Sequence, residues 1–334
     1  ASAGKVFHHP RGEGKEANPY SDPQSWDIQP KSLVGIKGVK IYQNEKGLGK
    51  WHNGEYKGYL GKLGVWGPVP YTKEESNEWK NAQFCVDYLK QDHDKPFFLA
   101  CGIFAPHAPH IAPQRYFDMY PLDQIKLPET PDDDMNDVPQ IAQTNFSTSF
   151  IKLIKEKGES LAVDVLGSVL TALNNSKYKD NTIVVLLTDN GFQLGHKNRW
   201  EKYSLWRMAT NVPLIIKYPG QSKGQVCQRA VSFLDIYPTI LDMLKVENPD
   251  FLEGHSIVDW LTDPDKPRDI PAVITHEKGN VSVVLDNWNY IRYKDGSEEL
   301  YDRSKDKFEY HNLAGELKYK ELKNKLAKFI PVDN

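Results

Sequence analysis

One stretch near the middle of the chain constrains the fold more than any other. Residues 182–187 form an unbroken apolar and β-branched run, the pattern of a parallel strand buried on both faces. The run leads into Asp189 and Asn190, and open α/β sheets bind their ligands at the carboxyl ends of such strands. Gly191 then allows a sharp turn. We therefore expect an α/β fold with a polar site at the end of this strand.

The residues after the strand suggest metal chemistry. The carboxylate of Asp189 and the amide oxygen of Asn190 are hard donors that suit Ca²⁺ or Mg²⁺, so both are candidate metal ligands. The following segment is dense in His, Lys, Arg and Trp and can cover such a site; its candidate binding residues are His196, Arg199, Trp200 and Lys202. An Asn-Gly dipeptide is also a common turn, so an ordinary strand end followed by a solvated loop stays open.

The wider pattern resembles a known enzyme family. Residues 188–191, 194–195 and 200–204 are similar to the second half of the metal site and to the sulfate-binding lysine of the type I sulfatases. These are formylglycine-dependent enzymes of the alkaline phosphatase superfamily, and the nearest likeness is to the iduronate-2-sulfatase and choline-sulfatase branches. The resemblance implies that Lys202 binds a sulfate oxygen. It also implies that the Asp-Asn pair binds Ca²⁺, with Mg²⁺ as the alternative.

The amino-terminal residues extend this resemblance. Residues 4–9 are similar to the family's Gly-Lys-x-x-His element. On that match Lys5 binds a sulfate oxygen and His8 faces the nucleophile. A loop histidine pair beside Pro10 is the alternative. A zinc site at His8 and His9 is disfavoured, because adjacent histidines rarely reach one metal and no third ligand has suitable spacing.

A second pair of histidines follows the apolar run at residues 97–101. Residues 105–110 are similar to the family's Lys-Pro-His-x-Pro, with Ala105 in place of the usual lysine. The resemblance implies that His107 contacts the scissile ester. His110 has no clear family counterpart and is a candidate substrate-binding residue. Without the resemblance, both histidines are equally well read as loop residues.

The family's nucleophile has no counterpart in this sequence. In the resembled enzymes a Cys or Ser within Cys-x-Pro-x-Arg becomes formylglycine, but none of Cys85, Cys101 and Cys227 has Pro two residues on and Arg four on. No Val-Asp-Asp pattern supplies the other metal ligands. We therefore expect formylglycine in a missing N-terminal segment, and an inactive chain without that segment. Three cysteines form no disulfide framework.

The remaining sequence predicts the architecture. We expect an alkaline-phosphatase-like α/β sandwich around a mostly parallel sheet over residues 1–267, with long loops at 10–70 and a further buried strand at 212–217. Thr72 and Glu75 predict a capped helix, a second helix is expected at 159–173, and residues 132–134 read as an acidic loop. Short alternating strands and a basic helix predict a C-terminal subdomain at 268–334, formed by an antiparallel sheet plus helix.

Composition limits the partners. The chain has 42 basic and 45 acidic residues, so no global field favours nucleic acid, and no apolar run reaches the ~18 residues of a membrane span. Seven lysines between Lys31 and Lys62, against Glu45 and Glu55, form either a solvated face or a cationic rim for an anionic polymer.

The resemblance implies a sulfuric ester hydrolase that acts on a sulfated carbohydrate. It also implies a periplasmic, secreted or lysosome-like location. A phosphodiesterase or phosphonate hydrolase of the same superfamily is the alternative, and so is a non-catalytic anion-binding protein.

Overall fold

The computed structural model describes residues 1–7, 23–30, 42–43, 48–51, 54–59, 66–69, 71–107, 110–121, 124, 126, 128–144, 159–221 and 223–332. Contacts divide the chain into two compact units. Unit 1 comprises Ala1–Lys126 with Leu153–Thr182, and unit 2 comprises Leu127–Lys152 with Ile183–Asn334. The domain boundary predicted between residues 267 and 268 stays a prediction.

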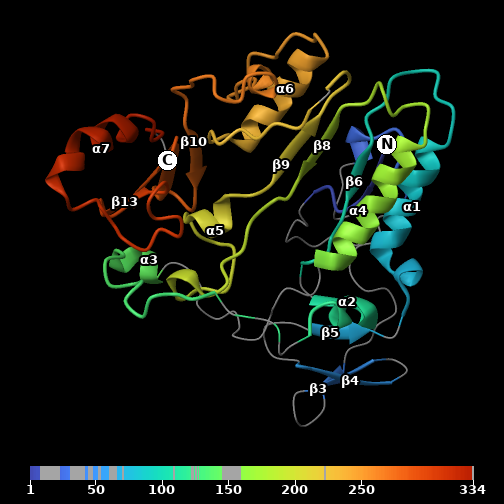
Figure 1. Ribbon diagram of the computed structural model, residues 1–334, viewed down its shortest axis with the longest axis horizontal. Helices are drawn as coiled ribbons and strands as arrows, with labels where there is room; N and C mark the ends of the chain where they lie inside the picture. Colours follow the sequence, from blue (N-terminus) through green and yellow to red (C-terminus); the bar gives the residue numbers. More distant parts are fainter. Residues whose placement is uncertain are drawn as a thin grey trace. The chain divides into compact units, whose positions relative to one another are not determined.

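Unit 1 contains a parallel strand pair and two helices beside it. Strand β1 (Ser2–Gly4) pairs with β6 (Ala100–Gly102). Helices α1 (Asn77–Leu89) and α4 (Glu159–Asn174) lie side by side next to this pair (Figure 1). The helix expected at 159–173 is therefore confirmed. A buried apolar cluster joins α1 and α4 to residues 112–117: Ala82, Ala112, Tyr116, Phe117, Leu161 and Val165.

The start of α1 differs from the expectation in one detail. Thr72 and Glu75 do form a capping box, in which the Thr72 N–H donates to Glu75 Oε2 over 2.7 Å, but the box begins a 3₁₀ turn, η2 (Lys73–Glu75). The α-helix itself is capped by Ser76, whose hydroxyl oxygen accepts from the N–H of Trp79 over 3.1 Å. Ser76 thereby satisfies one of the backbone donors that a helix leaves unpaired at its start.

The long loops expected at residues 10–70 are wrong where the structure describes this range. Strands β2 (Tyr42–Gln43), β3 (Leu48–Trp51) and β4 (Gly54–Tyr59) form an antiparallel sheet. Strand β5 (Trp66–Val69) pairs in parallel with β7 (His110–Pro113). Backbone hydrogen bonds hold such ladders whatever the side chains, and interspersed glycines hide the alternation that marks a strand in a sequence. The other short elements of unit 1 are η1 (Pro23–Ser25) and α2 (Gln114–Asp118).

The two central apolar runs are strands of unit 2, but their pairing and burial differ from the expectation. Strand β8 (Val184–Leu187) pairs with β9 (Leu214–Lys217) in antiparallel register. Burial on both faces is also wrong, since Leu187 is 40% exposed and Ile215 is 56% exposed. A paired strand covers only an edge of its neighbour, so side chains on the faces of β8 and β9 are exposed where no further element packs on them.

The C-terminal antiparallel sheet is confirmed. Its strand order follows the chain, and helix α7 (Lys320–Ala327) packs against it through Leu326. Leu326, at 0% exposed, joins a core that includes Val281, Tyr290 and Leu300. With the parallel pairs of unit 1, this sheet gives the expected mixed α/β class. The four strands are β10 (Ala272–Thr275), β11 (Val281–Leu285), β12 (Trp288–Arg292) and β13 (Glu298–Asp302).

Short helices connect the strands of unit 2. Helix α6 (Ile236–Met243) follows a 3₁₀ turn that Ser232 caps. The short elements are α3 (Gln140–Thr144), η4 (His196–Asn198), α5 (Arg207–Thr210), η5 (Phe233–Asp235), α6 (Ile236–Met243), η6 (Val258–Leu261) and η7 (Leu317–Tyr319).

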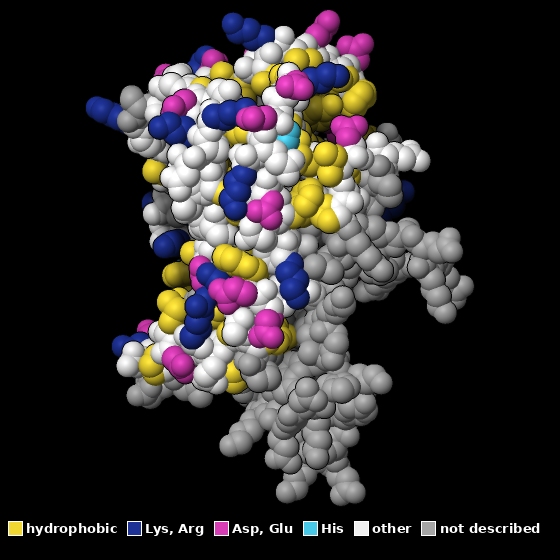
Figure 2. Space-filling model, turned by 90° about the vertical axis from the view of Figure 1, so that its right-hand side faces the viewer, with side chains coloured by type: hydrophobic (Ala, Val, Ile, Leu, Met, Phe, Trp, Pro, Cys, Tyr) yellow, Lys and Arg dark blue, Asp and Glu magenta, His cyan; other side chains and the backbone are white. Residues whose placement is uncertain are grey.

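Charged side chains of both signs are interspersed over the face of the molecule in Figure 2. This mixing fits the near balance of 42 basic and 45 acidic residues. Opposite charges at short range cancel each other's field, so the described residues of that face present no extended field of one sign.

Candidate active site

The polar residues after β8 form the start of the candidate site. Asp189 is exposed and Asn190 is partly buried. The Thr188 hydroxyl donates to the carbonyl oxygen of Asn190 over 2.8 Å, and the Asn190 side-chain amide donates to the carbonyl oxygen of Gly191 over 2.8 Å. The second bond fixes the side-chain amide of Asn190, and the amide oxygen Oδ1 stays available as an acceptor.

Lys202 contacts that oxygen. Its Nζ donates to Asn190 Oδ1 over 3.1 Å across a sequence separation of 12 residues. The ammonium also lies 5.8 Å from the ring centroid of Tyr203. The structure therefore brings together one predicted metal ligand and the predicted sulfate-binding lysine within unit 2. We call residues 189–202 the site loop.

Gly191 lies where the site loop passes close to the backbone of residues 208 and 209, and this close approach requires a glycine. Its N–H donates to the carbonyl oxygen of Ala209 over 2.9 Å. A Cβ at this position would lie 2.2 Å from the carbonyl oxygen of Met208. The glycine therefore serves close packing of the site loop against α5, and it is not among the glycines with positive φ.

The site loop folds back on itself. The N–H of Gln193 donates to the Glu201 carbonyl over 2.9 Å, and the N–H of Gly195 donates to the Arg199 carbonyl over 2.8 Å. Gly195 and Lys197 adopt left-handed backbone conformations, with φ of 110° and 55°. The second half of the loop runs back toward Asn190, and this places Lys202 beside it.

A buried ion pair anchors the middle of the loop. Lys197 Nζ lies 2.7 Å from Asp134 Oδ1, and the two side chains are 1% and 2% exposed. The backbone N–H of Lys197 also donates to Asp134 Oδ2 over 2.6 Å. Residues 132–134 lie in turns, as expected of an acidic loop, but within that loop Asp134 is buried and paired. The Asp134 carboxylate pairs with the buried Lys197 ammonium and also accepts from the Lys197 backbone N–H, which the left-handed conformation directs inward.

His196 and Arg199, predicted to bind substrate, are buried in unit 2. The His196 ring stacks on Phe308 at 4.9 Å between centroids, and burial lowers its pKa. Arg199 Nη2 donates to the Ala142 carbonyl over 2.7 Å, and Nη1 lies 3.2 Å from Glu201 Oε1. Burial also lowers the pKa of Arg199. Their described contacts hold the loop, and their roles toward substrate stay predictions.

Trp200 is partly buried, and its ring lies against Gly195. A Cβ on Gly195 would approach Trp200 Cζ2 to 3.5 Å, an ordinary contact distance. The ring therefore covers the left-handed turn of the loop. Its predicted contact with substrate stays a prediction.

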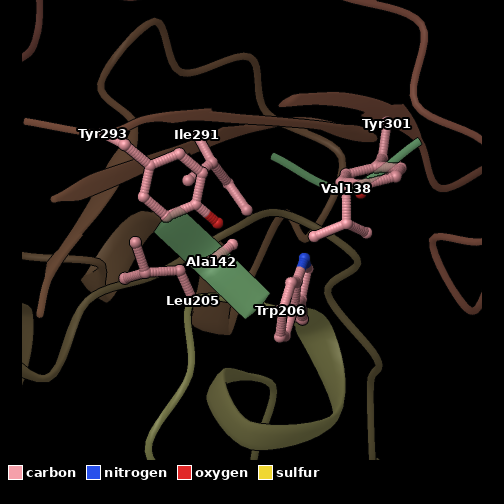
Figure 3. Packing of buried hydrophobic residues seen from close by; sticks show 7 residues of the cluster. All are labelled: Val138, Ala142, Leu205, Trp206, Ile291, Tyr293 and Tyr301. Carbon is pink, nitrogen blue, oxygen red and sulfur yellow. The ribbon is translucent and has the colours of Figure 1, made fainter. Parts of the chain in front are cut away.

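The chain just after the site loop is anchored in the C-terminal sheet, which sequence reasoning missed. Leu205 and Trp206 are buried in a cluster with Ile291, Tyr293 and Tyr301 (Figure 3). No local sequence signal links residues 299–302 to the loop. The sequence does not reveal which residues of the C-terminal sheet contact residues 205 and 206, because the partners lie far apart along the chain.

Two predicted residues of unit 1 meet at one aromatic ring. Lys5 Nζ lies 5.7 Å from the centroid of Phe104, and the His107 ring lies 4.7 Å from it. The N–H of Lys5 donates to the Gly102 carbonyl over 3.2 Å, which extends the β1–β6 pairing. The structure thus brings Lys5 and His107 to the same side chain.

Two other predicted residues are less fully described. His8 lies outside the described residues. His110 is the first residue of β7, where it lies opposite Trp66 in the ladder. Its role toward substrate stays a prediction.

The donor set for a metal is chemically suitable but small. The Asp189 carboxylate and the Asn190 amide oxygen are the oxygen donors that Ca²⁺ prefers, yet Ca²⁺ takes ~6–8 of them. No group of three or more His, Cys, Asp or Glu side chains with metal-binding geometry occurs among the residues that the structure describes. The two residues fit part of a calcium site, and Asn190 Oδ1 already accepts from Lys202.

Comparison with known families decides what this arrangement belongs to. The sequence matches the family model "Sulfatase" over residues 35–246. The chain belongs to the sulfatase family. Residues 195–331 also match the model "N-sulphoglucosamine sulphohydrolase, C-terminal". The family expectation is confirmed, and the particular branch stays a prediction.

Individual sulfatases agree with this assignment. A protein named "Sulfatase" from Formosa agariphila is 34% identical over 294 residues, covering 83% of this chain and 58% of the relative. An "Ulvan-active sulfatase" from the same organism is 26% identical, covering 77% of this chain and 54% of the relative. The chain thus spans little more than half the length of these curated sulfatases.

Solved structures confirm the expected alkaline-phosphatase-like fold. A phosphonate monoester hydrolase from Silicibacter pomeroyi superposes with a TM-score of 0.62 at 22% identity, covering 78% of this chain and 60% of that one. A "2-O GAG sulfatase" superposes with a TM-score of 0.58 at 22% identity, covering 82% and 68%. Among the described residues, no helix combines the length and apolar character that crossing a bilayer requires.

Proposed function

We propose that the protein to which this chain belongs is a sulfuric ester hydrolase acting on a sulfated carbohydrate. The observation that carries the proposal is the 3.1 Å contact between Lys202 Nζ and Asn190 Oδ1 in a chain of the sulfatase family. An ammonium held beside a potential metal ligand suits a sulfuryl group, because charge spreads over its oxygens as the ester bond breaks.

Lys202 has the properties of an anion-binding lysine. The side chain is partly buried, and its described hydrogen bond is to a neutral amide rather than to a carboxylate. Its charge is therefore not neutralised by that partner. A compact ammonium with three donors can keep this bond and still donate to a sulfate oxygen.

Asp189 and Asn190 would hold the metal that the family resemblance implies. Ca²⁺ is proposed, with Mg²⁺ as the alternative, because both prefer oxygen donors. A bound divalent cation supplies Lewis-acid stabilisation of a sulfuryl oxygen. The residues of this chain orient that site: Asn190 is fixed by its bond to the Gly191 carbonyl.

Lys5 and His107 keep their proposed roles as sulfate ligand and as contact of the ester oxygen. An imidazole can supply the proton that a leaving alkoxide needs. Formylglycine remains the proposed nucleophile, and none of Cys85, Cys101 and Cys227 lies in the motif that forms it. The lysines at 31–62 remain a proposed cationic rim; their side chains lie outside the described part of the chain.

A sulfated carbohydrate is favoured as substrate by what the similar proteins are called. One relative is named for activity on ulvan, and one structural neighbour is named a 2-O GAG sulfatase. A phosphonate monoester hydrolase with the same fold keeps phosphonate hydrolysis as the second candidate. We further propose a periplasmic, secreted or lysosome-like location, which cell fractionation with an antibody would test.

A comparison of kcat/KM on sulfate esters and on a phosphonate distinguishes the candidate functions. The full-length protein should release sulfate from sulfated oligosaccharides and 4-nitrophenyl sulfate with a higher kcat/KM than it shows for a 4-nitrophenyl phosphonate. A higher kcat/KM on the phosphonate would favour the second candidate. Binding of sulfated oligosaccharide without turnover of either ester would instead identify a non-catalytic anion-binding protein.

A further inference from the structure

A fully buried carboxylate in β13 contacts the chain just after the site loop. Glu299 is 0% exposed. Its Oε2 accepts from Trp206 Nε1 over 2.8 Å, its Oε1 accepts from the Tyr293 hydroxyl over 2.6 Å, and it also accepts from the Tyr301 hydroxyl. Three directed donors around one buried carboxylate fix both it and the Trp206 indole.

A second buried carboxylate holds the next residue. Glu309 is 0% exposed, and its Oε2 accepts from the backbone N–H of Arg207 over 2.7 Å. Its Oε1 accepts from Asn289 Nδ2 over 2.9 Å and from Arg303 Nε over 2.7 Å. Consecutive residues 206 and 207 are thus bound by separate carboxylates of the C-terminal part of unit 2.

These anchors reach Asn190 and Lys202 through short lengths of chain. The N–H groups of Ala209 and Thr210 both donate to the Trp206 carbonyl, and the Ala209 carbonyl accepts from Gly191, the residue next to Asn190. On the other side, the Ser204 N–H donates to the Lys202 carbonyl over 2.8 Å. The position of Trp206 therefore sets both ends of the site loop.

We propose that Glu299 is a positioning residue that holds Lys202 against Asn190 through its bond to Trp206. The inference rests on the proposed sulfatase function. Figure 3 shows the Trp206 ring between Val138 and α5, with its nitrogen turned away from the helix. Packing excludes water from the ring, which is 2% exposed, and the bond to Glu299 adds a directed contact that favours the orientation with the indole N–H toward this carboxylate. Small displacements of a charged group in a site can lower turnover by ~10²-fold.

The chain offers a matched control in the same strand. Glu298 is the neighbour of Glu299 in β13, but its carboxylate accepts from Lys323 Nζ over 2.6 Å and from the Tyr290 hydroxyl. Neither partner belongs to the site loop. E298Q therefore makes the same chemical change without touching Trp206, and W206F removes the indole donor while keeping an aromatic ring.

The test uses the full-length protein, with folded fraction measured by thermal melting and with rates normalised to it. E299Q and W206F should each lower kcat on a sulfated oligosaccharide ~10–100-fold, whereas E298Q should stay within twofold. Because Glu299 acts through Lys202, adding E299Q to the K202A variant should lower kcat by less than a further threefold. W206F keeps the inference testable if E299Q folds poorly.

The outcomes separate this inference from the proposed function. Equal losses from E299Q in the wild-type and K202A backgrounds would show that Glu299 serves folding alone, and would overturn the inference while leaving the sulfatase proposal standing. A wild-type protein that hydrolyses no sulfate ester would overturn the proposed function, and the inference with it.

Discussion

The ammonium of Lys202 donates to the side-chain oxygen of Asn190 over 3.1 Å. Asn190 lies three positions beyond the end of β8, and Lys202 is the last residue of the site loop, which folds back toward it. The contact leaves the Asn190 oxygen with one partner that is mobile in principle, because lysine has four rotatable bonds. The oxygen has a second lone pair for a divalent cation, and the ammonium has two further donors for a sulfate oxygen, as the proposed function requires.

Gly191→Ala should destabilise the protein. The added Cβ would lie 2.2 Å from the Met208 carbonyl oxygen, so α5 or the site loop must shift, at a cost of about 1–3 kcal/mol. Gly167→Ala is the control, since nothing lies within 4 Å of its Cβ position in α4, and it should stabilise by about 0.5–1 kcal/mol. Urea unfolding measures both; the same sign for the two variants would contradict the packing account.

The sequence reveals the elements that rest on local pattern. The antiparallel sheet of β10–β13 was expected, because side-chain alternation and turn residues are local features of the sequence. The contact of Lys202 with Asn190 was also within reach, since a resemblance placed both residues at one site.

The anchors of the site loop were beyond sequence reasoning. Asp134 and Lys197 are 63 residues apart, and Trp206 and Glu299 are 93 apart. A charged residue that becomes buried with a partner looks the same in sequence as one on a solvated face. The antiparallel pairing of β8 with β9 was missed for a similar reason, because an apolar run does not state the direction of its neighbour.

Asp134→Asn should cost about 3 kcal/mol or more of unfolding free energy. The substitution leaves the Lys197 ammonium buried without its counter-charge, and breaking a buried pair typically costs about 3–5 kcal/mol. Asp259 pairs with Lys266 at 69% and 50% exposure, so Asp259→Asn should cost under about 1 kcal/mol. Equal losses in chemical denaturation would mean that burial adds nothing to the Asp134 pair.

His196 should make stability depend on pH. Burial lowers its pKa below the ordinary value of 6.5, so the folded protein keeps the ring neutral while the unfolded chain binds a proton. Its contribution is fully present above about pH 6.5 and is lost as pH falls toward the lowered folded pKa. His196→Phe keeps the stack on Phe308 and should flatten the melting temperature between pH 6.5 and 5. An unchanged slope would contradict this placement.

Ca²⁺ should stabilise the full-length protein through Asp189. A cation at 100 times its Kd adds about 2.7 kcal/mol, a rise of several degrees in melting temperature, and Asp189→Asn should remove most of it. Asp180, whose side chain is 86% exposed, provides the control variant. Residues 1–334 alone should bind Ca²⁺ weakly, because two donors fall short of ~6–8. Tight calorimetric binding by this chain, unaffected by Asp189→Asn, would rule out the assignment.

The central claim is that Lys202 binds the sulfate of the substrate, and kinetics of the Lys202→Ala variant test it most directly. Removing one cation that stabilises developing charge should lower kcat/KM about 10²–10³-fold on both 4-nitrophenyl sulfate and a sulfated oligosaccharide. Lys320→Ala, on the exposed surface of α7, should remain within twofold of wild type. If the Lys202→Ala enzyme retains a third or more of the wild-type kcat/KM on both esters, Lys202 does not bind the sulfate and the account is wrong.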